Sequence, residues 1–276
     1  MRKILTICSL LTICNLILWG FAIVRAGSLL SAPALAGAEE TVPVVTQTPD
    51  PQPAVLSYLV EEPMGEAEPE LTEPSPLLAL TFDDGPSKDT TPLLLDGLRE
   101  RGVHATFFVL GTRAERAPEI VLQAHEDGHA IGGHSYDHRS YFTKISTEAL
   151  RAQLQKTDDA ITAIIGGEPP LLVRPPYGAV NETVAQKTGK ANILWNIDPR
   201  DWEVRDAENV YNNIIERAVD GGVVILHDIY ASTVEGTLKA IDELQAAGWQ
   251  FVTIPELFEA YDIPLEPGEI YRGPHN

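Results

Sequence analysis

Short apolar runs alternate with amphipathic stretches along the whole chain after Pro76, and this alternation constrains the fold more than any other feature. The runs have the length of strands and lie at residues 77–82, 105–109, 130–132, 171–173, 193–197, 223–226 and 251–254. Strands that alternate with helices favour a parallel sheet covered by helices, because parallel neighbours need crossover connections. The sequence therefore predicts an α/β fold, either a (β/α) barrel or an open doubly wound sheet.

The amphipathic stretches carry the signals of helix ends. Ser146 and Asp206 each stand before a set of apolar residues at helical spacing, where an N-cap belongs. Gly248 follows another such stretch, as a C-cap glycine does. No internal repeat is visible, so one domain accounts for the alternation. We expect that domain to span residues 77–262 and to be followed by a C-terminal tail at 263–276.

The first residues of the chain have a different composition. Arg2 and Lys3 precede an uncharged run of 21 residues, 4–24, which is about the ~20 residues that cross a bilayer. We therefore expect residues 1–26 to be a signal peptide or a membrane anchor, with the N-terminus in the cytoplasm and the remainder outside. Cleavage and retention both fit, since small residues at cleavage-site spacing follow an apolar run longer than most signal-peptide cores.

Residues 27–76 are rich in glutamate and proline and contain no lysine or arginine. Such a segment is typical of an extended, self-repelling linker. It lacks the aromatic clusters of a sugar-binding module, which favours an inert spacer over a wall-binding role. Both cysteines, Cys8 and Cys14, lie in the apolar run before it. The exported part therefore has no cysteine for disulfides or thiolate metal ligands.

The net charge argues against one class of partner. The first 76 residues hold three basic and nine acidic residues, so they contribute −6 to the formal charge of −20 and leave −14 for residues 77–276. Such a surface repels the phosphates of nucleic acid. We expect no nucleic-acid function and a monomeric catalytic domain.

Two groups of polar residues end predicted strands. Asp83 and Asp84 follow the first run, and adjacent carboxylates are costly unless a cation compensates them, although a plain polar turn is the alternative. His134 and His138 follow the third run, and on a helical turn their spacing would put both imidazoles on one face. Two imidazoles and one carboxylate suit zinc and similar metals, with positions left open for water and substrate.

Three further strand ends carry polar residues. Arg174 lies in a proline-rich turn after the fourth run, Asp201 and Trp202 come after the fifth, and His227 ends the sixth. In both candidate architectures the carboxyl ends of the strands form the active-site edge. The five groups together predict a metal-assisted catalytic site. The spacing of His134 and His138 is not repeated at three other histidines, for which we expect structural or surface roles: His104, His125 and His129.

These groups resemble the five motifs of the polysaccharide deacetylases of the NodB-homology type, also called carbohydrate esterase family 4. The motifs T-F-D-D-G-P, H-S-x-x-H, R-P-P-Y-G, D-P-R-D-W and L-H-D occur in that order within residues 77–262. The resemblance covers essentially the whole predicted domain. It implies a distorted (β/α) barrel and the hydrolytic removal of N- or O-linked acetyl groups.

Carried over by position, the resemblance implies a role for each residue. Asp84, His134 and His138 would hold the metal, and Asp83 would be the general base toward the attacking water. Zinc is the expected ion, and cobalt, nickel or manganese suit the same ligands.

Other positions would support this site. Arg174 would hold Asp83 by a salt bridge, while Asp201 would orient His227, the acid for the departing amine. The backbone N–H of Tyr177 would face the oxyanion. Two apolar side chains would wall the acetyl methyl group: Trp202 and Leu226.

The substrate predicted from the sequence is an acetylated polysaccharide of the cell envelope. Residues 141–146 and 195–202 look most similar to bacterial peptidoglycan N-acetylglucosamine deacetylases. N-acetylmuramic acid, chitin oligomers and O-acetylated xylan stay open, because the same site can attack either kind of carbonyl. A non-catalytic carbohydrate-binding protein is disfavoured, because binding alone would not need Asp83 and His227.

Overall fold

The computed structural model describes residues 75–139 and 141–275. The predicted signal or anchor segment 1–26 lies outside these residues, as does nearly all of the predicted linker 27–76. Within the described ranges, no helix has both the length and the apolar character needed to cross a membrane.

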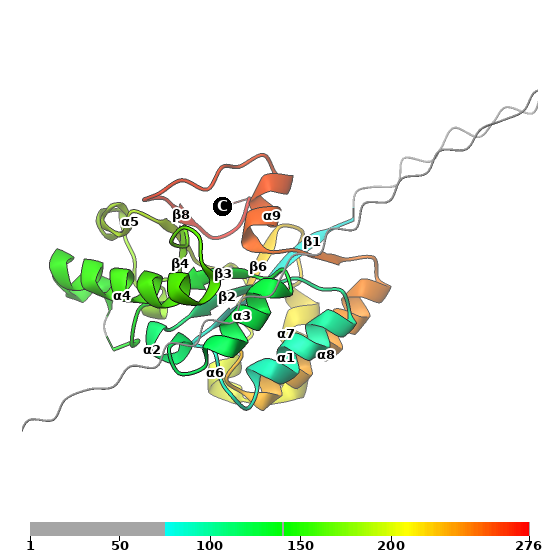
Figure 1. Cartoon of the computed structure of the whole chain (residues 1–276). Helices are drawn as coiled ribbons and strands as arrows, with labels where there is room; N and C mark the ends of the chain where they lie inside the picture. Colours follow the sequence, from blue (N-terminus) through cyan, green and yellow to red (C-terminus); the bar gives the residue numbers. More distant parts are fainter. Residues whose placement is uncertain (1–74, 140, 276) are drawn as a thin grey trace, which may run out of the picture. The chain divides into compact units, whose positions relative to one another are not determined.

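An eight-stranded sheet forms the centre of the domain, and all of its strand pairs are parallel (Figure 1). Its order is β6-β1-β2-β3-β4-β5-β8, and β7 pairs with β1. The strands are β1 (Leu77–Asp83), β2 (Thr106–Val109), β3 (Ala130–Gly133), β4 (Leu172–Val173), β5 (Ala191–Ile193), β6 (Gly222–His227), β7 (Gln250–Phe251) and β8 (Ile270–Tyr271).

Helices follow most of the strands, as the alternation predicted. They are α1 (Thr91–Glu100), α2 (Gly111–Ala114), α3 (Pro118–Glu126), α4 (Thr147–Ile165), α5 (Glu182–Thr188), α6 (Asp201–Val204), α7 (Ala207–Arg217), α8 (Ala231–Ala246) and α9 (Ile254–Ala260). A parallel bridge between Ile197 and Val224 brings the segment after β5 toward β6. The sheet therefore curls into a half-barrel, which confirms the distorted (β/α) barrel.

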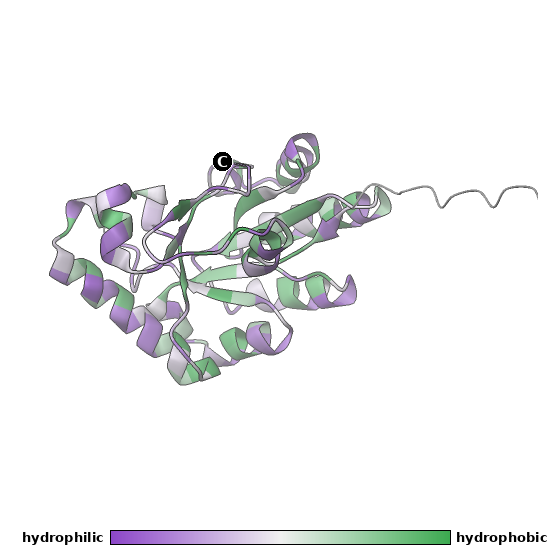
Figure 2. Cartoon of the chain, turned by 90° about the horizontal axis from the view of Figure 1, so that it is seen from above, coloured by the Kyte–Doolittle hydropathy of each residue, from purple (hydrophilic) through white to green (hydrophobic). Residues whose placement is uncertain are grey.

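The two faces of β1 show how the core is divided. Leu78, Leu80 and Phe82 point to one face and pack with the apolar sides of α1, α3, α7 and α8. Ala79, on the other face, packs against α9. Because side chains alternate along a strand, Thr81 and Asp83 share the face of Ala79 and point inside the curled sheet. In Figure 2 the strands are mostly green, while the surrounding helices mix green and purple, as amphipathic helices do.

Several sequence predictions are confirmed by the helix ends. The side chain of Ser146 accepts a hydrogen bond from the N–H of Ala149 at the start of α4, and Asp206 does the same for Asn209 at α7. Gly248 follows the end of α8 with a positive φ of 88°. The predicted N-caps hold because a short polar side chain satisfies an N–H that has no partner within the helix.

Three segments differ from the prediction. The run 193–197 is not a strand, since β5 ends at its first residue, and the rest turns toward β6. The run 251–254 divides between β7 and the start of α9. The segment expected as a tail contributes β8, and its Ile263 and Leu265 pack on the same apolar cluster as α9. Short apolar runs do not distinguish a strand from the first turn of a buried helix.

His129 illustrates an ordinary structural histidine. Its side chain is buried, and Nδ1 accepts a hydrogen bond from the N–H of Ala105. Burial lowers the pKa of His129 to about 4, so the ring is neutral at physiological pH. His104 and His125 are exposed, and none of the three lines the pocket described below.

Candidate active site

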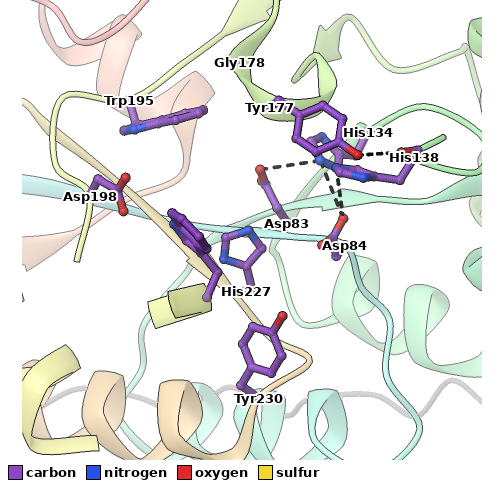
Figure 3. A pocket seen from close by; sticks show the side chains of 11 residues that line it. Asp83, Asp84, His134, His138, Tyr177, Gly178, Trp195, Asp198, His227 and Tyr230 are labelled. Carbon is purple, nitrogen blue, oxygen red and sulfur yellow. Dashed lines mark hydrogen bonds and ion pairs between the residues drawn. The ribbon is translucent and has the colours of Figure 1, made fainter. Parts of the chain in front are cut away.

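A pocket of about 400 Å³ opens beside the carboxyl ends of the strands (Figure 3). Figure 3 shows Asp84, His134 and His138 on one side of this pocket, with His227, Trp195 and Asp198 across from them. The lining residues are Asp83, Asp84, His134, His138, Tyr177, Gly178, Trp195, Asp198, Trp202, His227 and Tyr230.

Asp84, His134 and His138 form a set of side chains that could hold one metal ion. One ligand atom of each lies within 4.8 Å of the other two. Asp84 Oδ1 is 3.7 Å from His134 Nε2 and 3.6 Å from His138 Nε2. This oxygen is buried without a hydrogen-bond partner among the described residues, which is costly unless a cation meets it.

The protonation of the two imidazoles suits metal binding. His134 Nδ1 lies 2.7 Å from the carbonyl oxygen of Arg174 and must carry a proton to donate to it, so Nε2 keeps its lone pair for a ligand. Burial and the neighbouring His134 lower the pKa of His138 and favour its neutral form. The donor set therefore fits a divalent ion such as zinc.

The prediction that His134 and His138 share a helical turn is wrong. No helix covers residues 134–138: His134 follows β3 directly, and His138 lies in a loop with a φ of 59°. The loop folds back, so the ring centroids are still 4.9 Å apart. Asp84 and Tyr177 also have positive φ, at 71° and 61°. Such backbone is unfavourable for residues other than glycine and is often found at functional sites.

Asp83 is buried beside the triad and is held by Arg174. Arg174 Nη1 donates to Asp83 Oδ1 at 2.8 Å and to Thr81 Oγ1 at 2.7 Å. The remaining guanidinium nitrogens donate to the carbonyl oxygens of Ile193 and Leu194. Both charged side chains are at most 2% exposed. The pair thus fixes Asp83 Oδ1 and leaves Oδ2 directed toward the pocket, 3.8 Å from His134 Nε2.

His227 is fixed from behind by Asp201. Asp201 Oδ1 lies 2.9 Å from His227 Nδ1, and Oδ2 accepts from the backbone N–H of His227 and from Thr233 Oγ1. Burial by itself would lower the pKa of His227, but the hydrogen bond and charge of Asp201, with lesser help from Asp83 and Asp84, raise it to about 9. His227 is therefore protonated at neutral pH, with Nε2 available to the pocket.

One predicted site residue lies elsewhere. Leu226 is fully buried in the core cluster under the helices and does not line the pocket. Since His227 points into the pocket, its neighbour along β6 must point to the opposite face. Tyr177 and Trp202 do line the pocket, and both are about half exposed.

The pocket also contains residues that the sequence analysis did not assign. Trp195 and Tyr230 line it, and Tyr141 stacks on Tyr177 with ring centroids 4.2 Å apart. Tyr177 in turn meets the edge of His138. These aromatic rings lie in loops, where hydrophobic periodicity carries no signal. Trp195 lies inside the run 193–197, which was expected to be a strand, so nothing in the sequence indicated that it lines the pocket.

A half-barrel that carries at its strand ends a triad able to hold a metal ion, a buried aspartate and a histidine has the groups expected of a hydrolase, and comparisons identify the family. The polysaccharide deacetylase profile matches residues 70–194. A peptidoglycan-N-acetylglucosamine deacetylase of Bacillus cereus is 36% identical over 204 residues, which cover 71% of this chain and 94% of that protein. The chain belongs to the polysaccharide deacetylase family.

Two further relatives extend the comparison. A peptidoglycan-N-acetylglucosamine deacetylase of Listeria monocytogenes is 42% identical over 181 residues, or 66% of this chain and 38% of that longer protein. Among solved structures, a family 4 acetyl xylan esterase from Clostridium thermocellum, in complex with a cobalt ion, superposes with a TM-score of 0.67 at 30% identity. That match covers 71% of this chain and 98% of the esterase chain.

Proposed function

We propose that this protein is a metal-dependent hydrolase that removes acetyl groups from N-acetylated cell-wall polysaccharide, with N-acetylglucosamine of peptidoglycan as its substrate. The observation that carries the proposal is the pairing of Asp83 with His227 in the register of β1 and β6. Partners in register on neighbouring strands share a face, so a candidate base and a candidate acid meet at the same pocket as the triad.

Each group has a chemical task in this reaction. A divalent ion held by Asp84, His134 and His138 would polarise the acetyl carbonyl and acidify the attacking water. Asp83, anchored through Oδ1, accepts the proton of that water at Oδ2. His227 then donates the proton held at Nε2 to the departing amine.

The walls of the pocket support a sugar as the substrate. Trp195, Trp202, Tyr177 and Tyr230 present aromatic rings around the polar groups. Rings of this kind offer apolar faces to the C–H surfaces of a pyranose. The Tyr177 backbone, held with a positive φ, is the candidate oxyanion donor.

Peptidoglycan as the substrate is supported by the two relatives named above, and it implies an extracytoplasmic location in the cell envelope. The predicted export or anchor segment, 1–26, agrees with that location. The acetyl xylan esterase favours a second candidate, O-deacetylation of a polymer such as xylan, because a site of this design can attack an ester or an amide.

Acetate release tests the proposal directly. Purified peptidoglycan, chitin oligomers and acetylated xylan are each incubated with the protein, before and after chelation, and then with zinc, cobalt, nickel or manganese added back. We expect release from peptidoglycan to exceed release from the other two, to fall to background on chelation and to return with the metal. Release that chelation leaves intact would rule out the metal, and no release from any polymer would rule out the enzyme.

The pH dependence of the reaction tests the role of His227. As the general acid it must be protonated, so kcat/KM should fall as the pH rises through the pKa of about 9. Asp201→Asn removes the charge that raises this pKa, and the alkaline limb should then move to lower pH. Asp198→Asn is the matched control, because Asp198 also lines the pocket but its Oδ1 accepts from the N–H of Arg200 and not from His227. An unmoved limb in Asp201→Asn would contradict the assignment.

A further inference from the structure

A second pocket, of about 340 Å³, adjoins the triad on the side of α2. It shares Asp84 and His138 with the first pocket, so any group bound in it lies next to the reacting centre. Its other lining residues are Leu110, Thr112, Arg113, Arg116, Asp137 and Arg139. Three arginines therefore gather at one edge of the candidate active site in a protein whose residues 77–276 carry a net charge of −14.

These arginines are poorly neutralised. No salt bridge of the described part of the chain involves Arg113 or Arg116, whereas Arg99, Arg101, Arg174 and Arg200 all have carboxylate partners within 4 Å. Arg139 Nε lies 3.8 Å from Asp137 Oδ2, which is a long ion pair, and the Arg139 side chain is 85% exposed. The nearby carboxylate of Glu115 already accepts a hydrogen bond from Tyr136 Oη. The three arginines that line the pocket outnumber its two carboxylates, Asp84 and Asp137, by one.

The arginines are placed by the same segment that positions the metal ligands. The N–H groups of Gly111 and Thr112 donate to the carbonyl oxygens of Ser135 and Tyr136, which ties the start of α2 to the histidine loop. Arg113 lies in α2, and Arg116 lies in the turn that follows, where its N–H donates to the carbonyl oxygen of Arg113. Both arginines line the same pocket. Arg113 is partly buried and Arg116 is exposed.

Positive groups so close to a cation site would not help to hold a metal, but guanidinium groups bind carboxylates through paired hydrogen bonds. We propose that Arg113, Arg116 and Arg139 form a subsite for a carboxylate carried by the polysaccharide, on a sugar adjacent to the one that is deacetylated. This inference rests on the proposed function. A carboxylate subsite would favour peptidoglycan over chitin oligomers as the substrate, because the lactyl and peptide groups of peptidoglycan bear carboxylates, whereas chitin oligomers are neutral.

The test compares two forms of one substrate, a peptidoglycan tetrasaccharide with free lactyl carboxylates and the same glycan with those carboxylates amidated. The measured quantity is the ratio of kcat/KM for the acid to kcat/KM for the amide. We expect wild-type protein to prefer the acid, and we expect Arg116→Gln to lower the ratio by about tenfold, mainly through KM. Arg116→Lys should lose less of the preference than Arg116→Gln, because it keeps the charge but not the paired hydrogen bonds. Added salt should weaken the preference of the wild type.

Arg151→Gln, on the exposed side of α4, is the matched control and should leave the ratio unchanged. Thermal melting of each variant separates loss of preference from loss of folding. Equal kcat/KM for acid and amide in the wild type, or a ratio that Arg116→Gln and Arg113→Gln both leave intact, would overturn the subsite. Absence of acetate release from both forms would instead overturn the proposed function itself.

Discussion

Replacement of Asp83 by Asn is expected to lower kcat by about 10²- to 10⁴-fold while metal binding persists. The amide has nearly the same shape as the carboxylate but cannot accept the proton of water. The candidate metal ligands Asp84, His134 and His138 are untouched by the change. His227→Ala is expected to have a similar effect, because it removes the proposed proton donor, which lines the same pocket.

Two measurements on the same protein samples check this result: acetate release under saturating substrate and metal content after dialysis. Asp242→Asn, which removes an exposed carboxylate paired with Arg101, serves as the control for a change of one charge. If Asp83→Asn or His227→Ala retained full activity, the assigned base or acid would be wrong. If metal content fell together with activity, the loss would be one of metal binding and not of proton transfer.

Replacement of Arg174 by Met is expected to destabilise the domain by about 3–5 kcal/mol, because it leaves Asp83 buried without its charge partner. Arg174 has no exposed surface, and its guanidinium donates to Asp83, Thr81 and two carbonyl oxygens. It also lies 4.2 Å from the centre of the Phe108 ring. Methionine can fill much of this space but satisfies none of these acceptors.

The double variant Arg174→Met with Asp83→Asn separates charge from packing. Removing the charge of Asp83 should recover part of the lost free energy of unfolding, which denaturant titration measures. Arg151→Met, on the exposed side of α4, is the control for the substitution itself. Equal stability of the single and double variants would mean that the cost comes from packing and hydrogen bonds, not from the buried charge.

The local pattern of β1 shows how far sequence reasoning reaches. An apolar run of strand length that ends in Asp83 and Asp84 predicts a buried strand with polar groups at its carboxyl end, and both features are confirmed. The same reasoning predicted the N-caps of α4 and α7, since a cap depends on residues three positions apart. These are local properties.

The errors arise where contacts from elsewhere in the chain decide the structure. His134 and His138 were expected on a helical turn, but hydrogen bonds to α2 hold them in a loop. Leu226 was expected at the substrate. Because side chains alternate along β6, it points into the core while its neighbour His227 points into the pocket. The segment after residue 262 shows no strand pattern of its own, and β8 exists because β5 offers an unpaired edge.

The sequence by itself determined the α/β architecture, the strand ends that carry the polar residues and the kinds of side chain available for chemistry. All of these depend on hydrophobic spacing and residue type over a few neighbours. Only the tertiary structure decided that Asp83 lies beside His227 and that Arg174 pairs with Asp83. It also decided that Arg113 and Arg116 lie beside the triad without an ion pair to any residue that the structure describes. Distances between residues far apart in the chain follow from register and packing, which short stretches of sequence do not encode.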